Sequence, residues 1–145
     1  MVSFVHGIIC LSLSTYHFIY ERTECGDPKN WIEYFTLVMS GGYFLYDFLG
    51  MACLGVLDLD MAVHHLLCVS GIIVVLVQDI GCGCVVMGLF VAEVSNPAMH
   101  LRILLRHTGK RYTKSYELSE YIYFGTFFFG RIIIGHPVVY ITVMC

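Results

Sequence analysis

Residues 61–71 read Met-Ala-Val-His-His-Leu-Leu-Cys-Val-Ser-Gly and place two adjacent histidines, His64 and His65, at the start of an apolar run. The run continues through Ile-Ile-Val-Val-Leu-Val at positions 72–77. An apolar segment of this length predicts a membrane-spanning helix, because about 20 such residues cross the hydrocarbon core. Ionisable side chains are costly to bury inside such a helix. The two histidines are therefore either paired with other side chains for a structural reason or part of a functional site.

The composition also indicates a membrane protein. Of the 145 residues, 58% are hydrophobic and only 13% are charged, whereas soluble domains carry roughly 25% charged residues. The formal net charge of −3 offers no basic surface for nucleic acid, so we exclude that class of partner.

Apolar segments separated by short polar turns predict an all-α, multi-pass transmembrane bundle that forms one domain over residues 1–145. We expect about five spans, at residues 1–20, 34–57, 61–79, 85–101 and 121–143. Residues 21–33 are expected to form a polar loop, and residues 102–120 a basic loop.

The basic loop fixes the expected orientation, because it holds five of the eight Lys and Arg residues. The positive-inside rule places such a loop in the cytosol. Alternation then puts the turn at residues 58–60 on the same side and the loops with Cys25, Cys82 and Cys84 on the other. If that side is the endoplasmic reticulum lumen, a disulfide between Cys25 and Cys82 or Cys84 is an open alternative.

Polar side chains of four spans fall at similar depths. At about 1.5 Å per residue, the histidine pair lies roughly 7 Å from the cytosolic ends, residues 93–96 roughly 10–13 Å, and Asp47 and Arg131 roughly 15 Å. Buried charges in membranes pair with one another. We therefore expect one cluster in the cytosolic half, with Arg131 paired to Glu93 or Asp47, and Asp47 orienting one histidine.

This cluster has a structural and a chemical interpretation. Its polar pairs could only specify how the helices pack. Alternatively, a histidine backed by a carboxylate is the minimum for general base catalysis, for example of acyl transfer from a thioester. The catalytic candidates are His64, His65, Asp47 and Glu93, and the candidates for lipid contact are Ser95, Asn96 and Arg131. We expect no metal or cofactor, because adjacent helical histidines point about 100° apart.

The ordered set Gly42-Tyr43 with Asp47, His64-His65, Glu-Val-Ser-Asn-Pro at 93–97, and Arg131 resembles the TLC (TRAM–LAG–CLN) domain family. The resemblance runs from His6-Gly7 to about Gly135. It implies a multi-pass helical protein of the endoplasmic reticulum or plasma membrane that is linked to lipid metabolism. The family has six or more spans, so about five spans lead us to expect a shortened domain.

Ceramide synthases of this family are similar in carrying the first histidine pair. They also carry a His-Asp pair and a further Asp where this chain has Ala92-Glu93 and Asn96, so we do not expect ceramide synthesis. Three hypotheses follow: a lipid-binding protein that influences membrane lipid composition, an acyltransferase with acyl-CoA as co-substrate and His64 or His65 as base, and a non-catalytic trafficking or structural adaptor. Ala92 favours the first or third, and the retained histidines favour the first or second.

Overall fold

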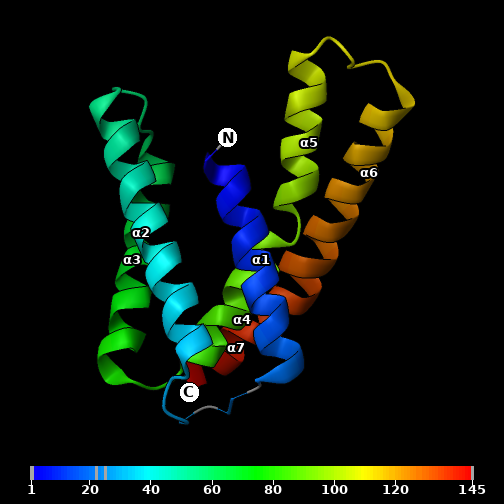
Figure 1. Ribbon diagram of the computed structural model, residues 1–145. Coiled ribbons are helices and arrows are strands. Elements are labelled where there is room, and N and C mark those ends of the chain that lie inside the picture. The colour runs from blue at the N-terminus through cyan, green and yellow to red at the C-terminus, as the bar shows by residue number, and fades with distance from the viewer. Residues whose placement is uncertain (1, 22, 25, 145) are drawn as a thin grey trace.

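The computed structural model describes residues 2–21, 23–24 and 26–144, and these residues form helices and turns without a strand (Figure 1). The helices are α1 Val2–Tyr20, α2 Trp31–Cys53, α3 Leu59–Gln78, α4 Cys82–Glu93, α5 Asn96–His107, α6 Lys114–Phe127, the π-helix η1 Phe128–Ile134, and α7 Gly135–Met144.

Two helical hairpins flank the first helix. Helices α2 and α3 form one hairpin, α5 and α6 form the other, and α1 lies between them and packs on α4 (Figure 1). The turn at residues 54–58 and the loop at residues 108–113 lie at one end of the bundle. The loop residues 26–30 and the turn at residues 79–81 lie at the opposite end (Figure 1). The chain therefore alternates between two ends, as the spans predict.

The prediction of a multi-pass membrane bundle is confirmed. Four helical stretches of the described residues are long and apolar enough to cross a bilayer: Val2–Tyr20, Leu59–Gln78, Cys82–His107 and Lys114–Met144. Helix α2 has a comparable length of 23 residues and packs on α1 and α3, but it is less apolar because it contains Glu33 and Asp47.

Helix α2 begins earlier than expected, so Glu33 belongs to its first turn and not to a loop. The side chain of Asn30 accepts the backbone N–H of Glu33 at 2.8 Å, and the Glu33 carboxylate accepts the backbone N–H of Asn30 at 3.0 Å. This reciprocal arrangement is a capping box, which satisfies N–H groups that a helix start leaves unpaired. The basic segment at residues 102–120 is also mostly helical, and only residues 108–113 form a loop.

Several helices bury polar side chains and expose large apolar ones. Helix α1 shows this most clearly, because the residues that it buries are His6, Gly7, Cys10, Ser14 and His17. Its exposed face carries large apolar side chains such as Val5, Ile9 and Ile19. A helix sorted in this way hides its polar stripe in the bundle and presents hydrocarbon to lipid.

Candidate functional site

The centre of the bundle is built around Glu93, the last residue of α4. Its side chain is buried and accepts a 2.7 Å hydrogen bond from the amide of Asn96. The helix is interrupted at this point because Pro97 has no N–H to donate to the preceding turn. Gly7 of α1 lies against the carboxylate: a Cβ atom there would lie 2.9 Å from Glu93 Oε2. A larger residue at this position would require the Glu93 carboxylate to shift.

His6 joins this centre to α2. Its Nδ1 lies 4.0 Å from Glu93 Oε1, and its Nε2 lies 3.3 Å from the hydroxyl of Ser40. The imidazole also stacks on Tyr43, with ring centroids 3.9 Å apart and an interplanar angle of 13°. The side chain of His6 is thus held on three sides by α2 and α4.

Asp47 orients His65, as predicted. The Nε2 of His65 lies 3.1 Å from Asp47 Oδ2, and its Nδ1 lies 2.8 Å from the carbonyl oxygen of Met61. Both ring nitrogens of His65 are therefore engaged by oxygen partners, which hold the ring in one orientation.

The neighbouring His64 has a different environment. Its ring is exposed, and its nearest polar contact is Cys68 Sγ at 3.8 Å. Phe44 packs against both histidines, with its ring centroid 6.0 Å from His64 and 5.7 Å from both His65 and His6. The histidine pair is therefore divided, with one ring bonded inside the bundle and the other open.

The contact expected for Arg131 is wrong. No carboxylate among the described residues lies within 4.0 Å of its guanidinium nitrogens. Its Nη2 instead donates to the carbonyl oxygen of Ala92 at 2.9 Å. Ser95, a candidate for lipid contact, is completely buried, and its hydroxyl has no hydrogen-bond partner among the described residues. Of the predicted cluster, Glu93 is joined to Asn96 and Asp47 to His65.

A second polar centre, at the opposite end of the bundle, was not predicted. The Nε2 of His17 lies 2.7 Å from Oε1 of Glu33, and the Thr23 hydroxyl donates to the same oxygen. Glu33 is 1% exposed. The sequence does contain the signal for its position, because Asn30 followed three residues later by Glu33 is a capping-box pattern.

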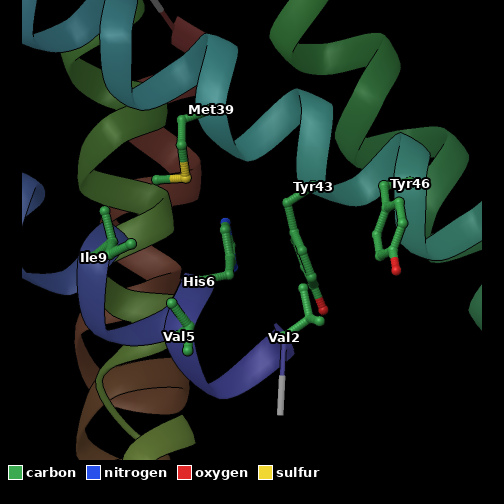
Figure 2. A pocket seen from close by; sticks show the side chains of 7 residues that line it. All are labelled: Val2, Val5, His6, Ile9, Met39, Tyr43 and Tyr46. Atoms are coloured by element: carbon green, nitrogen blue, oxygen red, sulfur yellow. The ribbon is translucent and has the colours of Figure 1, made fainter.

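An apolar groove of about 580 Å³ runs between α1 and α2 (Figure 2). It is lined by Val2, Val5, His6, Ile9, Met39, Tyr43 and Tyr46. Such a volume is in the range of small-molecule pockets. The stacked rings of His6 and Tyr43 form part of its wall, so the groove adjoins the centre that contains Glu93.

The described side chains supply no set of three His, Cys, Asp or Glu residues placed to hold a metal ion. Cys82 and Cys84 are free thiols. Cys25, their expected disulfide partner, lies outside the described residues.

Comparison with known proteins gives one family. The TLC domain (TRAM, LAG1 and CLN8) matches residues 1–145, which is the whole sequence. No solved structure matches the chain. The family match agrees with the helical membrane fold and with the ordered polar residues of the interior. The chain therefore belongs to the TLC domain family.

Proposed function

We propose that the chain binds a membrane lipid in the groove between α1 and α2 and thereby influences membrane lipid composition. The supporting observation is an apolar groove that adjoins the buried His6–Glu93 centre. The lining residues Val2 to Ile9 extend about 10 Å along α1, which is enough to hold part of an acyl chain. The localisation that we propose is the endoplasmic reticulum or the plasma membrane.

Within the family, we propose that the chain is of the type called TLC domain-containing protein 5 (transmembrane protein 136). This proposal is based on Leu-Phe-x-x-Glu-x-x-Asn-Pro at residues 89–97, followed by Arg102.

The groove is tested by filling it. In Val5→Trp, an exposed lining residue is replaced by a side chain large enough to occupy the groove without disturbing the core. The protein is reconstituted in nanodiscs with a photoactivatable phosphatidylcholine, and labelled peptides are identified by mass spectrometry. We expect saturable labelling of α1 and of residues 39–46, reduced at least fivefold in Val5→Trp.

Leu67→Trp is the matched control, because Leu67 is an exposed apolar residue of α3 outside the groove. Labelling that unlabelled lipid does not displace, or that falls equally in both variants, would contradict the proposal. The non-catalytic adaptor role would then be favoured, with the polar centres acting only in packing.

Acyl-CoA-dependent acyl transfer is the second candidate, and the Asp47–His65 pair is the observation that favours it. Against it, both ring nitrogens of His65 are engaged. His64 is open, but its polar contacts among the described residues are to the thiol of Cys68 and not to a carboxylate. Acyl transfer from acyl-CoA to membrane lipids, lost in His64→Ala and Glu93→Gln at normal protein level, would support the enzyme.

A further inference from the structure

Arg131 lies far from both ends of the last helical stretch. It is roughly 26 Å along the helix from Lys114 and roughly 20 Å from Met144. A cation at such depth is costly, and it is normally paired or placed at a functional site. The side chain of Arg131 is nevertheless exposed, and no carboxylate of the described residues forms an ion pair with it.

The contacts of Arg131 leave most of its donors available. A guanidinium has five N–H groups, and one hydrogen bond, from Nη2 to the carbonyl of Ala92, is formed with the described residues. The guanidinium carbon lies 5.2 Å from the centre of the Phe127 ring, which supports one face of the cation. The N–H edge of the guanidinium therefore remains able to bind further acceptors.

The acidic side chains of the interior are already engaged. Glu93 accepts the amide of Asn96 and lies beside His6, and Asp47 is bonded to His65. Neither carboxylate forms an ion pair with the Arg131 guanidinium, so an anion that pairs with it directly has to come from outside the described residues.

The backbone holds Arg131 in a fixed place. The preceding residue, Gly130, packs so closely on α4 that a Cβ atom there would lie 2.9 Å from Val94 Cγ1 and 3.3 Å from the carbonyl of Val91. Arg131 itself lies within η1, and π-helical segments occur frequently at functional sites. The cation is thus positioned beside the interruption between α4 and α5.

We propose that Arg131 binds the anionic group of a lipid that is drawn into the bundle, either a carboxylate or a phosphate. Both groups match the planar fork of a guanidinium, which binds two oxygens at once. This inference rests on the proposed lipid-binding function and names the class of lipid.

The test uses the whole chain in neutral nanodiscs, to which oleate, phosphatidic acid or diacylglycerol is added and binding is measured by native mass spectrometry. Oleate tests for a carboxylate ligand and phosphatidic acid tests for a phosphate ligand. Diacylglycerol has acyl chains but no charge, so it is the neutral control. We expect at least tenfold weaker binding of one of the two anionic lipids in Arg131→Gln, with partial recovery in Arg131→Lys. Diacylglycerol binding stays unchanged.

Arg106→Gln is the matched control, because it removes one positive charge from the last turn of α5, near the basic loop. Equal losses in Arg106→Gln and Arg131→Gln would show only non-specific attraction and would overturn the inference. An unchanged preference for anionic lipids in Arg131→Gln would also overturn it, leaving Arg131 as a cap of the Ala92 carbonyl. Should Arg131→Gln fail to fold, Arg131→Lys retains the charge but not the fork, and unaltered anionic binding in that variant overturns the inference.

Labelling of the groove by phosphatidylcholine is a separate measurement. If phosphatidylcholine labelling of the groove is lost in Val5→Trp but stays normal in Arg131→Gln, the groove and Arg131 act independently. If an anionic lipid binds through Arg131 but the groove shows no saturable labelling, only the proposal of a lipid in the groove is rejected.

Discussion

Nε2 of His17 and Oε1 of Glu33 lie 2.7 Å apart at the end of the bundle opposite the basic loop (Figure 1). Both side chains are buried, at 6% and 1% exposure. The pair joins the last turn of α1 to the first turn of α2, and the second carboxylate oxygen of Glu33 completes the capping box. The side chain of Glu33 therefore joins α1 to α2 and caps α2 at this end of the bundle.

Removing this carboxylate is expected to destabilise the protein severely. Glu33→Ala leaves His17 buried without its partner, which costs about 3–5 kcal/mol, and it also removes half of the capping box. Thermal unfolding in detergent measures the loss. Glu24→Gln removes an exposed carboxylate from the loop that precedes α2, so it should leave the midpoint nearly unchanged. Similar midpoints for the two variants would contradict the structural role of Glu33.

Two glycines of α4 should respond in opposite ways to alanine. A Cβ atom at Gly83 would lie 2.9 Å from Glu33 Oε1, whereas one at Gly88 would meet nothing within 4 Å. Gly83→Ala should therefore cost about 1–3 kcal/mol through overpacking. Gly88→Ala should stabilise by up to about 1 kcal/mol, because alanine is the better helix former. Unfolding midpoints measured side by side test the difference in sign.

The exposed ion pair between Lys29 and Asp79 should give a small pH dependence. The Lys29 ammonium lies 2.5 Å from Asp79 Oδ1. Its hydrogen bond lowers the pKa of Asp79 and, reciprocally, raises the pKa of Lys29. The Asp79 contribution to stability is present above the unfolded pKa of about 4 and is lost as pH falls through the lower folded value. The Lys29 contribution is present below its unfolded pKa and is lost as pH rises through the higher folded value.

Unfolding midpoints recorded from pH 3 to pH 6 should therefore fall less steeply at the acid end in Asp79→Asn than in the natural protein. Asp58→Asn is the control, because Asp58 lies in the turn at the other end of the bundle and its side chain makes no capping hydrogen bond. Identical acid profiles for the natural protein and Asp79→Asn would show that the pair contributes nothing measurable, as is common for exposed pairs.

The orientation of the bundle is tested with epitope tags. A tag inserted in the loop at residues 108–113 should be digested by protease added to sealed microsomes, because the positive-inside rule places this loop in the cytosol. A tag in the loop at residues 26–28 should be protected, since that loop lies at the opposite end of the bundle (Figure 1). Protection of the first tag and digestion of the second would reverse the orientation.

Helical period and depth explain which parts of the site could be predicted. Counting residues from the turn at one end placed Asp47 and a histidine at similar depths, and the structure joins Asp47 to His65. The same counting could not pair Arg131 correctly, because depth does not give the rotation of a helix. The π-helical turn of η1 changes that rotation further, and no residue pattern announced it.

The other omissions have local causes. His17 lies in an apolar segment, and its partner Glu33 follows a run of polar residues that is typical of a loop. His6 and Gly7 are unusual residues for a simple anchor, but their contact with Glu93 joins segments that are far apart in the sequence. Such contacts depend on how the helices are arranged, which periodicity alone does not specify.

The polar stripe of α1 has a consequence for biosynthesis. His17 meets Glu33 only 16 residues later in the chain, so this end of α1 can be satisfied almost as soon as α2 emerges from the ribosome. His6 must wait for Glu93, which at about 5–20 residues per second is translated roughly 4–17 s afterwards. During that interval His6 can contact Ser40 and Tyr43 of α2, but it lacks its carboxylate partner. The polar contact between His17 and Glu33 can therefore form first, and the contact between His6 and Glu93 forms last.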